Sequence, residues 1–349
     1  MKSKKKAGIY MHSTQHAVGI LSTGRYLPDK VITNADLEKM VDTSDEWIVT
    51  RTGIRERRMA AEGETTSDLA VKAAQNALNK AGVSAEQLDL IIIATATPDM
   101  FFPSTACLVQ ERIGAKKAAA FDLSAACSGF LYGTSVAAQF IKNGMYRYAL
   151  VIGVETLSKI VDWTDRNTCV LFGDGAGAVV LGPVEEGMGF LSFELGADGS
   201  GAELLKLEAG GSRKPVATVE PGSRDNYVHM AGSEVFKFAV RAMNTASDNA
   251  VAKAGITKEQ VDFLVPHQAN LRIIDSAVKR LGLRDDKVVI NLNKYGNMSS
   301  ASIPVALDEA VSEGRIKEGD TLVLVGFGGG LTWGASVMKW STAEKKEVE

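Results

Sequence analysis

Apolar residues along the chain fall into short continuous runs and longer stretches with helical spacing. Residues 90–95, 149–154 and 321–325 are runs rich in Ile, Leu and Val, which is typical of buried strands, and residues 17–21 predict a first strand before a turn at 24–28. Residues 130–141 and 271–281 carry apolar side chains three and four positions apart, which predicts amphipathic helices. This alternation indicates an α/β chain with a mostly parallel sheet.

A repeat divides this pattern into two similar halves. The segment KAGVSAEQLD at residues 80–89 reappears as KAGITKEQVD at residues 253–262, and each copy leads from an alanine-rich helical stretch into an apolar run. Residues 141–144 and 316–319 match at almost the same offset. Chance similarity of common residues is the alternative to a duplicated α/β unit. We divide the chain into a flexible extension (1–16), a first half (17–183) and a second half (184–349).

One turn between a predicted strand and a predicted helix carries a candidate nucleophile. Residues 118–124 read as a small, buried strand, and the helix begins near Phe130, so Cys127 lies at the start of the helix. Unpaired N–H groups and the helix dipole there favour the thiolate and predict a lowered thiol pKa. The alternative is that Cys127 is a small buried residue, the usual place of a free cysteine.

Two polar residues of the second half complete a possible site. His267 ends the strand predicted before residue 267, and Asn297 lies in a stretch of small polar residues, 293–302, that we read as another strand end. Ligands of open α/β sheets gather at the carboxyl ends of strands, which predicts that Cys127, His267 and Asn297 converge. A lone histidine after proline is more often structural.

Two glycine-rich stretches have different interpretations. Residues 172–181 lead into a β-branched apolar run instead of an amphipathic helix, so we interpret them as a tight turn into a strand and not as a dinucleotide fingerprint. Residues 327–334 follow a strand, and their backbone N–H groups are candidate oxyanion donors. Residues 200–226 are predicted to form an irregular surface loop or lid.

A predicted helix near residue 45 presents an aromatic ring and a cation together. Thr43 or Ser44 can cap this helix, and Trp47 and Arg51 lie four residues apart on one of its faces. The alternative is a solvated basic surface with one packed tryptophan.

Composition restricts the class of protein. The 349 residues are 45% hydrophobic and carry a net charge of −3. The net charge therefore shows no excess of basic residues of the kind that nucleic-acid-binding proteins carry. The chain has only three cysteines, Cys107, Cys127 and Cys169, and this small, odd number favours a reducing compartment, the cytoplasm. Their spacing is not that of metal ligands, so no metal site is predicted. The basic residues 1–16 contain no apolar signal region, and no run predicts a membrane span.

Together these motifs resemble β-ketoacyl-acyl carrier protein synthase III, a condensing-enzyme family of the thiolase superfamily. The resemblance covers residues 17–340 and rests on residues 43–53, 125–130, 172–181, 266–270, 295–297 and 328–334. It implies a thiolase-like fold of two βαβαβαβ halves in a five-layered α-β-α-β-α arrangement, and a homodimer. The implied activity is a decarboxylative Claisen condensation of a short acyl-coenzyme A primer with malonyl-acyl carrier protein, which initiates type II fatty acid synthesis.

The same resemblance implies roles for individual residues. Cys127 would carry the acyl group, and His267 and Asn297 would hydrogen-bond the malonyl thioester and its enolate. The N–H groups of Cys127 and Gly330 would form the oxyanion hole. Coenzyme A is then a substrate, and no cofactor is bound permanently. The remaining implied contacts are Trp47, Arg51, Arg166 and Asn270 for coenzyme A, Phe102 for the partner's acyl pocket, and Arg272, Lys279 and Arg280 for the carrier protein.

Four other classes of protein share part of this pattern of motifs. Thiolases use a second cysteine near the C-terminal glycine loop, and residues 327–334 contain none; elongating synthases have a second histidine where Asn297 stands. A papain-like hydrolase would share the order of Cys127, His267 and Asn297, but not the duplication or the signature around its cysteine. An inactive binding module would keep the fold without releasing coenzyme A.

Overall fold

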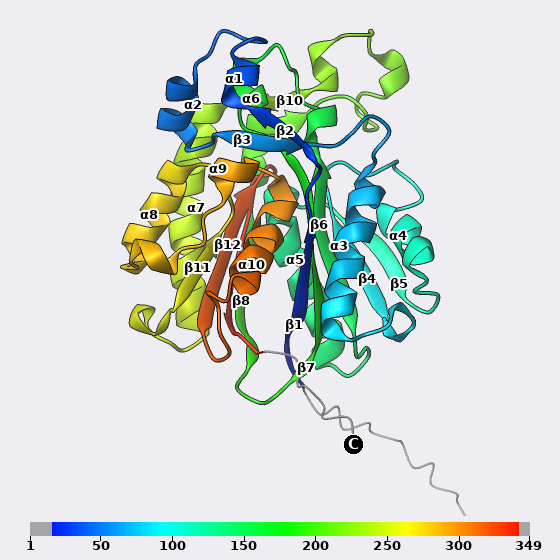
Figure 1. Cartoon of the computed structure of the whole chain (residues 1–349), viewed down its shortest axis with the longest axis vertical. Helices are drawn as coiled ribbons and strands as arrows, with labels where there is room; N and C mark the ends of the chain where they lie inside the picture. Colours follow the sequence, from blue (N-terminus) through cyan, green and yellow to red (C-terminus); the bar gives the residue numbers. More distant parts are fainter. Residues whose placement is uncertain (1–15, 342–349) are drawn as a thin grey trace, which may run out of the picture.

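The computed structural model describes residues 16–341, so the predicted flexible extension lies almost wholly outside the described residues. Two sheets form its framework, one of five strands in the order β1-β7-β6-β4-β5 and one of four in the order β11-β12-β13-β8. Figure 1 shows them side by side. The first sheet comprises β1 (Ala17–Tyr26), β4 (Leu90–Ala94), β5 (Ala119–Leu123), β6 (Ala149–Thr156) and β7 (Asp174–Val184). The second comprises β8 (Gly189–Ala197), β11 (Phe263–Pro266), β12 (Thr321–Gly328) and β13 (Thr332–Lys339).

Helices complete five layers. The outer side of the first sheet packs against α3 (Thr66–Ala81) and α4 (Thr105–Ile113), and that of the second packs against α7 (Gly232–Lys253) and α8 (Leu271–Leu281). Between the sheets lie α5 (Gly129–Lys142) and α10 (Ser302–Ser312), which contact strands of both. The α-β-α-β-α arrangement that the resemblance implied is therefore present (Figure 1).

The two sheets repeat one topology. The order β4-β6-β7-β1 of the first corresponds to β11-β12-β13-β8 of the second, and the corresponding pairs, β4 with β6 and β11 with β12, are parallel, as is β4 with the edge strand β5. Our expectation of a mostly parallel sheet was wrong, because β7 and β13 both return antiparallel. The turn from β12 to β13 is too short for the crossover that parallel pairing requires. The division after residue 183 falls near the end of β7 and stays a prediction.

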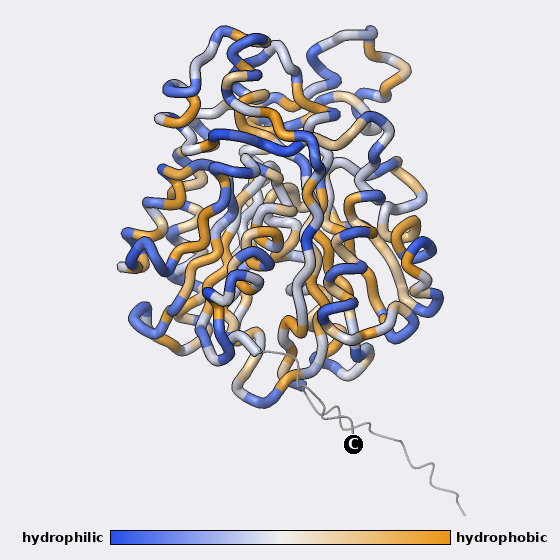
Figure 2. The backbone as a smooth tube through the Cα atoms, viewed as in Figure 1, coloured by the Kyte–Doolittle hydropathy of each residue, from blue (hydrophilic) through white to orange (hydrophobic). Residues whose placement is uncertain are grey.

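Local sequence explains where the helices begin and end. Thr65 and Asp68 form a capping box at the start of α3, and Asn270 caps α8 by accepting from the N–H of Arg272. Both helices end at a glycine in the left-handed conformation, Gly82 and Gly282. Their apolar faces are buried against the sheets, and Figure 2 shows hydrophobic residues concentrated along the strands with hydrophilic ones on the outer loops.

Short elements cover the end of the sheets that carries the strand-to-helix turns (Figure 1). The segment 200–226 is irregular, as expected, and contains only short 3-10 turns and β9. No helix within residues 16–341 combines the length and apolar character that crossing a bilayer requires. The short elements are β2 (Lys30–Thr33), α1 (Asn34–Leu37), α2 (Asp45–Thr52), β3 (Glu56–Met59), α6 (Arg166–Cys169), β9 (Leu205–Leu207), β10 (Val228–Met230) and α9 (Leu292–Tyr295).

Three local predictions were wrong. The strand before Cys127, β5, is a partly exposed edge strand instead of a buried one, because within this chain only β4 pairs with it. The first strand extends to Tyr26, through part of the predicted turn, because β7 pairs with it along its whole length. Asn297 follows the short helix α9 and makes only an isolated bridge to Phe172, so it does not end a strand.

Candidate active site

Cys127 lies in a 3-10 turn, Ala126–Ser128, between β5 and α5, as the sequence predicts. Its thiol is buried, and burial raises its pKa to about 12. A hydrogen bond from the Ser299 hydroxyl acts in the opposite direction, whereas the nearby Glu155 carboxylate raises the pKa further. The expected lowering of the pKa by the helix terminus was therefore wrong, because removal from water outweighs it.

His267 follows β11 directly, and its backbone N–H donates to the carbonyl of Val325 at 2.7 Å. The imidazole is buried against the edge of Phe327, with 5.4 Å between ring centroids. Both ring nitrogens lack a hydrogen-bond partner among residues 16–341. Burial lowers the pKa of His267 to about 3, so the ring is neutral at physiological pH and one of its nitrogens carries a hydrogen. A buried donor without a partner is suited to a ligand.

Asn297 is held by its backbone and by its side-chain oxygen. Its N–H donates to the carbonyl of Leu171 at 2.8 Å, and its carbonyl accepts from the N–H of Gly173 at 3.0 Å. Its Oδ1 accepts from the N–H of Ser299 at 2.8 Å. This leaves the Nδ2 amide group as the donor available to a ligand.

The strand β12 brings these residues together. A Cβ added to Gly326 would lie 3.4 Å from Cβ of His267 and 3.5 Å from the carbonyl oxygen of Cys127, and a Cβ added to Gly328 would lie only 2.5 Å from the nitrogen of Cys127. Glycine is required at Gly328 because a side chain would overlap the backbone of Cys127. Ser299 completes the group, because it contacts both Asn297 and the Cys127 sulfur.

The glycine turn after β12 runs from Gly328 to Leu331. Of its glycines, Gly328 lies against Cys127, whereas a Cβ on Gly330 would lie 2.9 Å from Cγ2 of Thr332. The Thr332 hydroxyl in turn donates to the carbonyl of Ala125 at 2.9 Å, which ties the glycine turn to the cysteine turn. The assignment of Gly330 as an oxyanion donor stays a prediction.

A buried polar group that was not predicted from the sequence lies next to Cys127. Glu155 is fully buried at the end of β6, and its carboxylate accepts from Thr97 Oγ1 at 2.7 Å and Ser300 Oγ at 2.9 Å. The N–H of Ala96 donates to it at 3.0 Å. The available signal was a single acid at the end of an otherwise apolar strand, residues 149–156.

The residues predicted to contact coenzyme A gather around Trp47, at the end of the molecule formed by α2, α6 and α8. The guanidinium carbons of Arg51 and Arg166 lie 4.5 and 5.4 Å from its ring centroid. Asn270 donates from Nδ2 to the carbonyl of Arg51 at 2.8 Å, and Arg166 donates to the carbonyl of Asp42 at 2.7 Å. The predicted pairing of Trp47 with Arg51 is present.

The three cations predicted for carrier-protein docking lie on the exposed side of α8. Arg272 stands over the ring of Phe236 at 5.0 Å, near the start of the helix. Arg280 is paired with Asp248 at 2.7 Å, so much of its charge is balanced within the chain. Lys279 is exposed one residue earlier. Arg272 and Lys279 are therefore the cations of this group that remain for a partner.

Phe102 and its neighbour Phe101 are the most exposed large hydrophobic residues described, at 85% and 77%. They precede α4 and lie in sequence between β4 and the edge strand β5. Exposed rings of this size are typical of protein interfaces.

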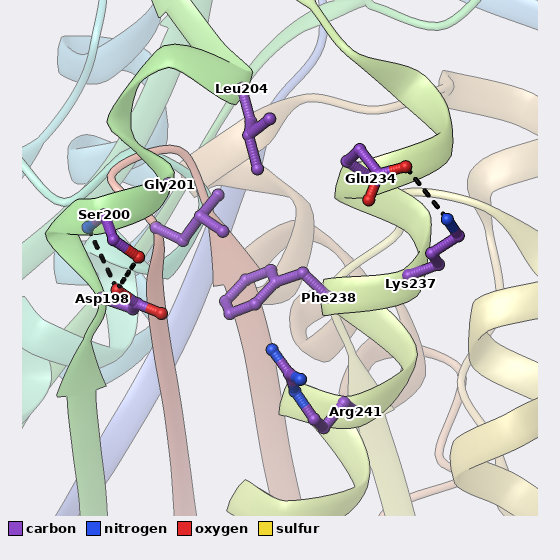
Figure 3. Close-up of a pocket in the computed structure, with 9 residues that line it drawn as sticks. Asp198, Ser200, Gly201, Leu204, Glu234, Lys237, Phe238 and Arg241 are labelled. Atoms are coloured by element: carbon purple, nitrogen blue, oxygen red, sulfur yellow. Dashed lines mark hydrogen bonds and ion pairs between the residues drawn. The ribbon is translucent and has the colours of Figure 1, made fainter.

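A separate surface cavity of about 330 Å³ lies between residues 198–204 and the first turns of α7. Figure 3 shows Phe238 and Arg241 extending from α7 towards Asp198 and Ser200. None of the predicted site residues lines this cavity. Among residues 16–341, no group of three His, Cys, Asp or Glu side chains is placed to hold a metal ion.

Comparisons with known proteins identify the family. The family model described as "3-Oxoacyl-[acyl-carrier-protein (ACP)] synthase III" matches residues 121–199, and its C-terminal counterpart matches residues 251–340. Proteins named "Beta-ketoacyl-[acyl-carrier-protein] synthase III" are 62% identical over 325 residues in Desulfitobacterium hafniense and 58% identical over 323 residues in Clostridioides difficile. Each alignment covers 93% of this chain and 98% of the relative.

Solved structures agree. The synthase III from Thermus thermophilus is 55% identical with a TM-score of 0.87, and that from Aquifex aeolicus VF5 is 50% identical with a TM-score of 0.86. Each alignment covers 93% of this chain and 100% of the solved chain. The chain therefore belongs to the β-ketoacyl-[acyl-carrier-protein] synthase III family of thiolase-fold condensing acyltransferases.

Proposed function

We propose that this chain condenses a short acyl-coenzyme A with malonyl-acyl carrier protein through an acyl-Cys127 intermediate, and so initiates type II fatty acid synthesis. The observation that carries the proposal is the arrangement around β12. A buried thiol and two neutral donors, His267 and Asn297, lie around glycines whose lack of a side chain lets β12 approach Cys127 and His267 closely.

In the first half-reaction, the sulfur of Cys127 attacks the thioester carbonyl of the primer and coenzyme A leaves. The oxyanion that forms needs preorganised donors. The N–H of Cys127 and an N–H of the adjacent glycine turn, Gly330 by the family resemblance, would supply them. The proximity of the two turns supports this, since Thr332 ties one to the other.

In the second half-reaction, His267 and Asn297 donate hydrogen bonds to the thioester oxygen of the malonyl group. Loss of carbon dioxide leaves an enolate whose charge these donors stabilise, and its carbon attacks the acyl-Cys127 thioester. A neutral imidazole suits this role, because it donates one hydrogen bond without placing a cation in the buried site. The lowered pKa of His267 supports a neutral ring.

Cationic and aromatic groups at the rim suit the two large substrates. Trp47 and Arg166 would stack on the adenine of coenzyme A, with Arg51 and Asn270 at other parts of the molecule. Arg272 and Lys279 with Arg280 would receive the acidic carrier protein, although the net charge of this chain is −3. Coenzyme A is then a substrate and not a permanently bound cofactor.

A homodimer would cover the exposed edge of the first sheet. The edge strand β5 and the exposed rings of Phe101 and Phe102 support this surface as the interface, with Phe102 closing the partner's acyl pocket. Three cysteines without a disulfide among them fit a reducing compartment, the cytoplasm.

The test is an assay of both half-reactions with labelled acetyl- and isobutyryl-coenzyme A and malonyl-acyl carrier protein. Cys127→Ser should lower acyl-enzyme formation on the order of 1,000-fold or more, because an alcohol is a far weaker nucleophile at neutral pH. The control is Cys107→Ser, which alters an exposed thiol and should retain the parent rate. Acylation of Cys127→Ser at the parent rate would refute the assignment of the nucleophile.

A further inference from the structure

The turn of the second half that corresponds to the cysteine turn is folded against the nucleophile. Ser299 follows Ala126 by the same number of residues that separates the two copies of the repeated segment, and both residues have φ of 46°. Each begins a 3-10 turn that leads into a helix between the two sheets, α10 for Ser299 and α5 for Ala126. Positive φ is unusual for a residue with a side chain, and residues strained in this way cluster at active sites and ligand-binding sites.

Ala126 adopts the same φ as Ser299 without a hydroxyl group, so this backbone conformation does not require one. The hydroxyl of Ser299 therefore needs another explanation. It is a hydrogen-bond partner of the Cys127 sulfur on one side and of the Glu155 carboxylate on the other, so it can accept from the thiol while it donates to the carboxylate. Ser299 thus connects a thiol that has to lose a proton with a buried carboxylate.

The environment of Glu155 suits a proton acceptor. Thr97, the N–H of Ala96 and Ser300 all donate to its oxygens, which favours the carboxylate, but burial outweighs them and raises its pKa above the ordinary value. A raised pKa brings the carboxyl closer to the range in which it can accept and return a proton at neutral pH.

The other titratable group beside Cys127 is less suited to this task. His267 comes from the end of β11, is neutral, and with a pKa of about 3 is a weak base. Glu155 and Cys127 also interact, because the carboxylate raises the pKa of the thiol. Two negative charges in one buried site are unfavourable, so the pair carries one negative charge at a time and shares one proton.

We propose that Ser299 and Glu155 form the path that takes the proton from the Cys127 thiol during acyl transfer and returns it to coenzyme A. The S–H bond of Cys127 breaks and its proton passes to Ser299 Oγ, while the hydroxyl proton of Ser299 passes to Glu155. The thiolate forms the bond to the acyl carbon, and the carbon–sulfur bond to coenzyme A breaks with its electron pair on the leaving sulfur. Reversal of the path protonates that sulfur and restores the Glu155 carboxylate. The path rests on the acyl-transfer step of the proposed function.

Two variants and one control separate this role from a structural one. Ser299→Ala keeps the backbone conformation that Ala126 already adopts, and Glu155→Gln keeps the size of the buried side chain. The control is Ser302→Ala, which removes a buried hydroxyl of the same segment that accepts a hydrogen bond from the N–H of Met298. All are made in a Cys107→Ser background, so that the exposed thiol does not react.

The first readout is the pH profile of Cys127 alkylation by iodoacetamide, followed by mass spectrometry of the labelled peptide. Ser299→Ala should move the profile to higher pH, because the thiolate loses a hydrogen bond. Glu155→Gln should move it to lower pH, because a negative charge beside the sulfur is lost. Opposite shifts from two neighbouring substitutions are not expected from general loosening of the site. Unchanged profiles would overturn the proposal.

The second readout is the rate of acyl-enzyme formation from acetyl-coenzyme A at pH 7. Both variants should lose roughly 100-fold, the usual size of a lost acid–base path, whereas Ser302→Ala should stay within a few-fold of the parent. Parent-like rates in Ser299→Ala and Glu155→Gln would overturn the path. If the parent itself forms no acyl-enzyme, the proposed function fails instead, and the alkylation profiles still test the path. If Glu155→Gln does not fold, Ser299→Ala decides.

Discussion

The residues around Cys127 form the interior of the site, and those around Trp47 and the start of α8 form its rim. The two regions depend on different kinds of interaction. Around Cys127, the proposed functional groups are buried, the Asn297 side chain is held by a hydrogen bond from Ser299, and the ring of His267 is kept neutral. Around Trp47 and along the start of α8, the proposed functional groups are exposed cations beside partly buried rings, such as Arg51 beside Trp47 and Arg272 beside Phe236. Interactions in the interior are little screened by salt, whereas those at the rim weaken as ionic strength rises. Chemistry and docking should therefore be separable by experiment.

The largest effect is expected from removing an interior donor. His267→Ala and Asn297→Ala should each lower condensation on the order of 100-fold, because an enolate donor is lost. Acyl-enzyme formation should remain near the parent level, since neither side chain takes part in that step. Labelled acetyl-coenzyme A measures the first step and product formation measures the second. Equal loss in acyl-enzyme formation and in condensation would show that His267 and Asn297 are not specific to the condensation step.

The neutral state of His267 predicts a pH dependence of stability. Its pKa is lowered to about 3 on folding, so the unfolded chain binds this proton more tightly. The stability that a neutral ring contributes is full above pH 6.5 and is lost as the pH falls from 6.5 towards 3, by about 2 kcal/mol at pH 5. Urea unfolding of the parent and of His267→Asn at pH 7.5 and 5 measures the difference.

In that comparison the variant should lose less stability on acidification than the parent. Glu155 and Asp174, whose pKa values are raised by burial, act in the opposite direction in both proteins and cancel. Equal losses in parent and variant would mean that His267 is not kept neutral by burial.

The rim should respond to charge and salt. Arg272→Glu should weaken malonyl-acyl carrier protein binding about tenfold at low salt and flatten its salt dependence, because one attractive charge becomes repulsive. The matched control is Lys142→Glu at the far end of α5, which makes the same charge change away from the rim. KM for the carrier protein at two salt concentrations is the measurement. An equal effect of both variants would indicate overall charge instead of a docking surface.

The smallest effect concerns the primer. Phe102→Ala should improve six- to eight-carbon primers relative to acetyl by a few-fold, since each methylene that becomes buried is worth about 0.8 kcal/mol. Phe101→Ala is the control, because it removes an equally exposed neighbouring ring. Primer preference and sedimentation are measured on the same samples. An unchanged preference in an intact dimer would contradict the pocket assignment.

The sequence predicted much of this arrangement because its signals are local. Helical spacing located α5 and α8, and the turns that hold Cys127 and His267 follow directly from strand and helix patterns. The convergence of Cys127 and His267 followed from the rule that active sites gather at strand ends. The repeat indicated the duplicated topology.

What could not be predicted depends on contacts between distant segments. The thiol pKa of Cys127 depends on burial and on Glu155 and Ser299, and a helix terminus considered alone gives the opposite direction. Nothing in the residues around Asn297 reveals its bridge to Phe172. The exposure of β5 depends on which strands flank it in space. Its small apolar residues do not show that it is an edge strand.

The second copy of the cysteine turn limits how many acyl groups one chain can hold. Ser300 corresponds in position to Cys127, but a Cβ added to Gly153 would lie 2.1 Å from the Ser300 carbonyl oxygen, so this turn is pressed against β6. In the first half this position carries a buried thiol, whereas in the second half it carries a serine whose hydroxyl is hydrogen-bonded to the Ala94 carbonyl and the Glu155 carboxylate. Active-site titration should therefore saturate at one acyl group per chain.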